Sequence, residues 1–176
     1  MEMQNLKQEI LAGKIFIYPT DTIYGLGCDA TNIAAVNRIK EIKVRDKDKP
    51  LSVIAPSINW IKENFIIEKG LNLKQYLPGP FTILLKKKNP EFLLHVSSND
   101  KIGIRIPDSK FTKEIQKSGV PFITTSVNLS GEPFVLNLEE IKQEIKDKVD
   151  YIIESKEKMS GVPSTLILNG KPIERK

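Results

Sequence analysis

Five short polar segments carry the side chains with which this sequence could do chemistry. The first, 18–27 (YPTDTIYGLG), follows the apolar stretch KIFI. Thr20 and Thr22 offer hydroxyls that both donate and accept hydrogen bonds, and Gly25 and Gly27 would let the backbone approach a ligand closely. The segment matches neither the GxGxxG fingerprint nor the P-loop. A polar turn that caps a helix explains it equally well.

The second segment, 40–50 (KEIKVRDKDKP), is rich in lysine and arginine and begins at the end of a predicted helix. Such a cluster is usually solvated charge that compensates the helix dipole. Here, however, Lys43 and Arg45 occupy alternate positions and can point together once the helix ends. Because cationic side chains bind phosphate oxygens strongly, this pair could grip a polyphosphate.

The third segment, 102–107 (IGIRIP), places Arg105 in an otherwise apolar strand. Successive side chains of a strand point to opposite faces, so Arg105 faces away from Ile104 and Ile106. If that face is buried, the guanidinium needs an anion, because a buried unpaired charge is very costly. If the face is exposed, no such partner is required.

The fourth and fifth segments are rich in hydroxyl groups. Segment 124–133 (TTSVNLSGEP) follows a predicted strand, and segment 160–165 (SGVPST) precedes one. Each by itself is an ordinary Ser/Thr turn. Together, however, the five segments lie at the ends of predicted strands, which is where open α/β sheets bind ligands.

Helical and strand patterns alternate around these segments. We expect helices over 5–11, 57–64, 71–76, 109–118 and 138–146, and one that begins at an Asn32 cap. We expect strands over 14–18, 51–55, 81–86, 102–106, 121–125, 151–154 and 165–168, and then a hairpin turn at Asn169-Gly170. The pattern predicts an α/β or α+β fold with one continuous core, without repeats or a dividing linker.

Composition limits the classes of function. The chain has 176 residues, of which 40% are hydrophobic, enough for one domain with a real core. Its single cysteine, Cys28, and single histidine, His95, exclude an intrachain disulfide and a Cys/His zinc site. The net charge of +5 favours anionic partners, either nucleotides or RNA. The sequence shows no signal peptide and no apolar run that could span a bilayer, so we expect a cytoplasmic protein without a membrane partner.

Six motifs resemble, in order and spacing, those of the YrdC-like proteins, the TsaC-type threonylcarbamoyl-adenylate synthases. They are YPTDTIYGLG, IKVRDKDKPLSV, PGPFTILLK, GIRIPD, TTSVNLSGEP and GVPSTLI. The resemblance runs from about Leu6 to the C-terminus. It implies a twisted, open mixed α/β sheet with flanking helices around a basic concave cavity. It also implies a single YrdC-like domain over 1–176, without the extra C-terminal domain of longer members.

The resemblance further implies an enzyme, a nucleotidyltransferase that makes threonylcarbamoyl-AMP and pyrophosphate from L-threonine, bicarbonate and ATP. Mg²⁺ would be carried by the ATP phosphates rather than by a metal site of the protein. The product would pass to transfer proteins that modify tRNA, so tRNA would be an indirect partner.

Family roles carry over to particular residues. The resemblance implies that Lys43 and Arg45 are catalytic, at the nucleotide phosphates. It implies that threonine is bound by Thr22, Arg105 and Thr124, and that nucleotide is bound by Arg45, Lys49, Ser126, Asn128 and Ser164. Three positions depart from the usual pattern. Val127 fills the middle of the Ser-x-Asn motif, Ile54 stands where some members have a polar substrate contact, and Phe134 stands where some have a serine at the nucleotide.

Two other functions stay open at this point. The first is an RNA-binding module, for double-stranded RNA or tRNA, without catalysis of its own. Its basic charge fits, but aromatic residues make up only 7% of the chain, which is few for a base-stacking platform. The second is a carbamoyl-transfer enzyme with a YrdC-like domain inside a larger protein.

Overall fold

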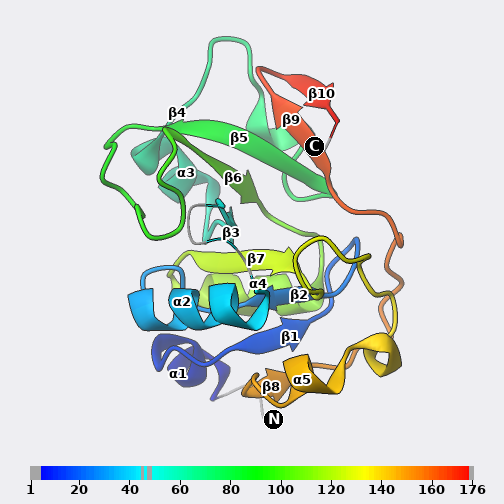
Figure 1. Cartoon of the computed structure of the whole chain (residues 1–176). Helices are drawn as coiled ribbons and strands as arrows, with labels where there is room; N and C mark the ends of the chain where they lie inside the picture. The colour runs from blue at the N-terminus through cyan, green and yellow to red at the C-terminus, as the bar shows by residue number, and fades with distance from the viewer. Residues whose placement is uncertain (1–4, 45, 47–48, 175–176) are drawn as a thin grey trace.

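A mixed β-sheet with helices against its faces forms the framework of the computed structural model, which describes residues 5–44, 46 and 49–174 (Figure 1). The described strands join one 10-stranded sheet in the order β10-β9-β5-β6-β3-β7-β2-β1-β8, and β4 pairs with β5. The strands are β1 Phe16–Tyr18, β2 Gly25–Gly27, β3 Ser52–Ile54, β4 Phe65–Ile66, β5 Phe81–Lys87, β6 Lys101–Arg105, β7 Phe122–Ser126, β8 Tyr151–Ile152, β9 Thr165–Leu168 and β10 Lys171–Ile173.

The predicted mixed sheet with flanking helices is thus confirmed. Parallel pairs (β1·β8, β3·β6, β5·β9) occur beside antiparallel ones (β1·β2, β2·β7, β3·β7, β5·β6). The helices are α1 Leu6–Leu11, α2 Ile33–Ile42, α3 Ile58–Asn64, α4 Lys110–Ser118 and α5 Gln143–Lys146, with 3-10 turns at Leu73–Gln75 and Leu138–Glu140. One sheet is compatible with a single domain over 1–176, which stays a prediction.

Alternation along β1 shows how the sheet packs against helices on two faces. Ile17 belongs to the larger core cluster, together with Val36 and Ile39 of α2. Its neighbour Phe16 points the other way, into a second cluster. That second cluster is formed with α1 and α4, which contribute Leu6, Ile10, Phe111 and Ile115. The period of two in a strand therefore places two apolar layers on opposite faces of the same backbone.

Local signals fixed several helix boundaries. The Asn32 side chain accepts a hydrogen bond from the Ala35 amide at 3.0 Å, so the predicted N-cap is confirmed. Gly119 ends α4 in the left-handed conformation, with a φ of 82°. The continuous helix predicted over 138–146 is wrong. A 3-10 turn is followed by an extended Ile141, whose side chain is buried, and α5 begins only afterwards.

Among the described residues, no helix combines the length and apolarity that crossing a bilayer requires.

Candidate functional site

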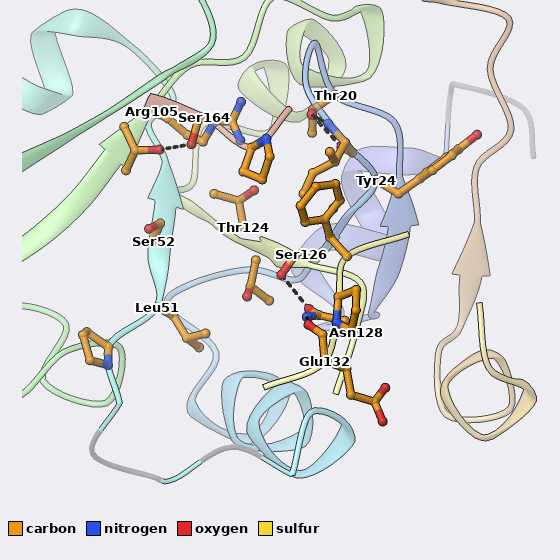
Figure 2. A pocket seen from close by; sticks show the side chains of 18 residues that line it. Thr20, Tyr24, Leu51, Ser52, Arg105, Thr124, Ser126, Asn128, Glu132 and Ser164 are labelled. Carbon is orange, nitrogen blue, oxygen red and sulfur yellow. Dashed lines mark hydrogen bonds between the residues drawn. The ribbon is translucent and has the colours of Figure 1, made fainter. Parts of the chain in front are cut away.

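All five polar segments of the sequence meet at one pocket (Figure 2). Its volume of about 420 Å³ lies within the range of roughly 300–1,000 Å³ that is usual for small-molecule sites. The lining contains many hydroxyl groups and few charges. The residues are Thr20, Ile23, Tyr24, Gly25, Pro50, Leu51, Ser52, Thr82, Arg105, Thr124, Thr125, Ser126, Asn128, Glu132, Pro133, Phe134, Pro163 and Ser164.

Arg105 forms one end of the pocket, at the last residue of β6. Its side chain is only 8% exposed, so the strand face is buried and the predicted need for an anion applies. Asp21 supplies that anion, because its Oδ1 accepts a hydrogen bond from Arg105 Nη2 at 2.8 Å. The same nitrogen donates to Thr22 Oγ1 at 3.2 Å. A guanidinium has five N–H donors, so this pairing is compatible with binding a substrate carboxylate.

Thr22, predicted to contact threonine, is fully buried and lies behind the wall that Thr20 lines. The two hydroxyl oxygens are 2.9 Å apart, and that of Thr20 also donates to the Ile23 carbonyl at 2.7 Å. Thr20 is therefore the threonine of this turn that lines the pocket, and its hydroxyl is bonded within the turn. Thr22 is bonded to two residues of the pocket lining, Thr20 and Arg105, and its predicted contact with threonine stays a prediction.

Strand β7, which lies between β2 and β3, carries Thr124 and Ser126 along the pocket (Figure 2). The Thr124 side chain lies between the Arg105 end and the opposite end, where Ser126 and Asn128 lie. Ser126 Oγ donates to Asn128 Oδ1 at 2.6 Å. Val127, between them, is 1% exposed, so the unusual residue of the Ser-x-Asn motif points into the core.

Lys43 lies beneath the Ser126–Asn128 end and is itself 1% exposed. Its ammonium donates to the carbonyl oxygens of Ser126 at 2.5 Å and Asn128 at 2.7 Å, and to Asn128 Oδ1 at 2.9 Å. An ammonium has three N–H donors. Contact with a phosphate would therefore compete with one of these bonds. The predicted catalytic role of Lys43 stays a prediction, and the described contacts are with the loop.

Ser164, predicted to bind nucleotide, lies beside Arg105 and away from Ser126 and Asn128 (Figure 2). Its hydroxyl shares a hydrogen bond of 2.7 Å with Thr82 of β5. The residues predicted to bind nucleotide are therefore divided between two ends of the pocket.

The remaining members of the basic segment are placed only in part. Arg45 lies outside the described residues. Lys49 is exposed, and its neighbours Pro50 and Leu51 reach the pocket wall. The predicted basic character of the cavity is not confirmed, because the described charged side chains of the lining are Arg105, paired with Asp21, and Glu132, which lies 2.6 Å from Lys142.

Some features of the site were missed or misread from the sequence. Asp21 stands in the first polar segment, but the sequence did not show that it pairs with Arg105. Ser52 and Thr82 gave no signal of their own, because they lie inside strands. Gly27 was expected to let a ligand approach, but a Cβ there would lie 2.0 Å from the Ile123 carbonyl oxygen. The lack of a side chain at Gly27 therefore allows the neighbouring strands to pack closely. Tyr24 also lines the pocket, and its pKa is raised by burial and then by the charge of Glu154.

The only histidine takes part in the framework. His95 Nε2 lies 2.7 Å from the Ala30 carbonyl oxygen, a contact that fixes the ring against the core. Within the part of the chain that the structure describes, no three His, Cys, Asp or Glu side chains gather as metal ligands would.

Comparison with known proteins adds independent evidence. The Sua5/YciO/YrdC family model, described as telomere recombination, matches residues 8–174. A Methanocaldococcus jannaschii protein, named provisionally as a threonylcarbamoyl-AMP synthase, is 41% identical over 94% of this chain and 79% of its own length. The threonylcarbamoyl-AMP synthase of Pseudoalteromonas translucida is 31% identical over 90% of this chain and 89% of its own.

A solved structure agrees with these relatives. Pyrococcus abyssi Sua5, crystallised with L-threonine, superimposes with a TM-score of 0.82 at 29% identity, over 96% of this chain. This chain spans about half of that protein, 51% of its length. Fold, motifs and relatives agree, and the chain belongs to the Sua5/YciO/YrdC family.

Proposed function

We propose that this protein is a threonylcarbamoyl-AMP synthase, which joins L-threonine, bicarbonate and ATP into threonylcarbamoyl-AMP and releases pyrophosphate. The observation that carries the proposal is the convergence of all five motif segments on one pocket. A relative that this chain matches over most of its length, from Pseudoalteromonas translucida, bears the name of that enzyme, which supports the same reaction.

The chemistry requires positioning more than a strong base. The threonine amine and bicarbonate form a carbamate with loss of water. A carbamate oxygen then attacks the α-phosphorus of ATP, the bond to the β-phosphate oxygen breaks, and pyrophosphate leaves. Such displacements depend on aligned reactants and offset charge. A pocket of hydroxyls, amides and fixed backbone, without a catalytic histidine, fits that requirement.

The amino acid would occupy the Arg105 end. A guanidinium binds a carboxylate through two parallel hydrogen bonds, and Arg105 is buried with its orientation fixed by Asp21 and Thr22. Thr20 and Thr124 line the wall beside it and would contact the rest of the amino acid. A bound threonine in Pyrococcus abyssi Sua5 supports the existence of such a subsite in the family fold.

The nucleotide would occupy the Ser126–Asn128 end, where Phe134 and Pro133 form an apolar wall. Lys43 would act there through the loop that it holds, and Arg45 and Lys49 would reach the phosphates from the adjoining segment. Mg²⁺ would arrive as part of the ATP substrate and offset phosphate charge. The product would then pass to proteins that transfer the threonylcarbamoyl group to tRNA.

The competing RNA-binding function is less well supported. The described charged lining consists of Arg105 and Glu132, each beside an oppositely charged side chain. A pocket lined by hydroxyl groups suits small molecules better than a nucleic acid backbone, which needs a basic surface.

The test is direct product formation. The purified protein is incubated with ATP, L-threonine, bicarbonate and Mg²⁺, and pyrophosphate and the mass of threonylcarbamoyl-AMP are measured. We expect a product that depends on bicarbonate and that forms without tRNA, because every atom of it comes from the small molecules. The absence of a bicarbonate-dependent product would overturn the proposal.

A further inference from the structure

Asp21 joins three segments of the chain that meet at the Arg105 end of the pocket. Its Oδ1 accepts from Arg105 Nη2 at 2.8 Å, and its Oδ2 accepts from the Asp108 amide at 3.1 Å. Its own carbonyl oxygen accepts from the Ser160 amide at 3.0 Å. The side chain is 13% exposed and lies outside the pocket lining. Asp21 therefore touches the pocket wall from behind.

Only a carboxylate can make both side-chain contacts. Arg105 and the Asp108 amide are both donors, so each oxygen of Asp21 must act as an acceptor. An asparagine side chain has one acceptor and one donor. In either orientation, its NH₂ group would face an N–H group. The position therefore depends on the chemistry of the carboxylate as well as on its size.

The contacts fix the direction of the Arg105 fork. The guanidinium is planar, so holding Nη2 between Asp21 and Thr22 sets the plane of the remaining nitrogens before a substrate arrives. A bidentate pair with a carboxylate depends on that plane. Because the guanidinium is already oriented, less conformational entropy is lost when the substrate binds.

We infer that Asp21 is a positioning residue for the amino-acid substrate, which orients Arg105 toward the threonine carboxylate without touching it. This inference rests on the proposed function. It assigns to the aspartate of the PTDT turn a role in substrate affinity beyond that of closing the turn.

Calorimetric titration with L-threonine, and separately with a non-hydrolysable ATP analogue, tests the inference on the wild type and Asp21→Asn. We expect Asp21→Asn to bind threonine about tenfold more weakly, the effect of losing a charged hydrogen bond. Binding of the nucleotide analogue should change less than about twofold, because Asp21 does not contact the Ser126–Asn128 end.

Asp150 offers a matched control. It accepts from a backbone amide, that of Ile15 at 2.8 Å, and from an arginine, Arg38 at 3.4 Å, but both donors meet the same oxygen, Oδ2. Asp150→Asn should alter thermal stability but leave both titrations unchanged. Asp21→Glu keeps both acceptors one methylene further out, so its threonine affinity should lie between those of the wild type and Asp21→Asn. If Asp21→Asn fails to fold, the comparison of Asp21→Glu with the wild type carries the test.

The outcomes separate this inference from the proposed function. A wild type that binds no threonine would overturn the proposed function, and this inference with it. Unchanged or tighter threonine binding in the Asp21 variants, beside a wild type that binds, would overturn only the positioning role. Equal weakening of threonine and nucleotide would also overturn it, because Asp21 would then merely hold the pocket together.

Discussion

Two buried cationic side chains, Arg105 and Lys43, lie at opposite ends of the pocket, and different kinds of contact hold them in place. Arg105, on a strand, is oriented by side chains of one turn, Asp21 and Thr22. Lys43, just after α2, is held by two main-chain carbonyls and one amide oxygen of a distant loop. The first arrangement fixes a guanidinium against an already rigid strand. The second uses the cation to give a loop its shape.

The comparison teaches that burial of a cation in a site does not by itself define its role. Replacing Arg105 should chiefly change what the pocket binds, because the sheet around it is held by backbone pairing. Replacing Lys43 should chiefly change the folded loop, because the loop would lose the three hydrogen bonds that the ammonium donates to it.

The largest effect is expected from Lys43→Met, which keeps an unbranched stem and removes the ammonium. Three hydrogen bonds to the ammonium are lost, each worth about 1 kcal/mol or more, although the Ser126 carbonyl keeps the Asn128 amide and Asn128 Oδ1 keeps the Ser126 hydroxyl as donors. We expect the free energy of unfolding to fall by about 3 kcal/mol or more, measured by urea denaturation, and nucleotide binding to weaken with it.

Lys87→Met is the matched control for Lys43→Met. Lys87 is 3% exposed and lies away from the pocket, and its ammonium donates to the Ser97 carbonyl at 3.1 Å. Its replacement should cost only about 1 kcal/mol and spare nucleotide binding. Equal losses for the two variants would remove the distinction between a loop-shaping lysine and an ordinary buried one.

Arg105→Lys should have the next largest effect, and chiefly on binding. Lysine keeps the charge but has a different reach and lacks the planar fork. Loss of that geometry should cost about 1.5–3 kcal/mol of threonine affinity, roughly ten- to a hundredfold. Titrations with threonine and an ATP analogue measure both ligands. If only nucleotide binding weakened, Arg105 would instead be assigned to the phosphates of the nucleotide.

Ser164→Ala should have the smallest effect and would sharpen the division of the pocket. The family resemblance assigns Ser164 to the nucleotide, whereas its side chain lies beside Arg105 (Figure 2). We expect threonine to bind about fivefold more weakly, equivalent to about 1 kcal/mol, with little change for the nucleotide. Ser160→Ala, outside the pocket lining, should change neither titration. A loss confined to the nucleotide would favour the assignment made from the sequence.

Much of the fold could be predicted because its signals are local. The Asn32 cap, the Gly119 stop and the Asn169-Gly170 turn each depend on a few neighbouring residues, and the structure contains all three. Strand β2 was missed because it is only three residues long and two of them are glycines. The break at Ile141 was missed because tertiary burial of that side chain overrides a helical pattern.

The site was predicted as a set of segments but not as a set of contacts. Each polar segment was visible by itself, and all five reach the pocket. The partners of Arg105 and Lys43 lie more than 80 residues away along the chain. No spacing rule pairs groups at such separations, so the sequence could not show that Asp21 meets Arg105 or that Lys43 lies beneath Ser126.

A crystal structure of the protein with L-threonine and a non-hydrolysable ATP analogue bound together would test the division of the pocket most directly. The account predicts the threonine carboxylate against Arg105 and the nucleotide beside Ser126 and Asn128, with the amine of threonine directed toward the α-phosphate. Threonine bound outside this pocket, or the two ligands at exchanged ends, would contradict it.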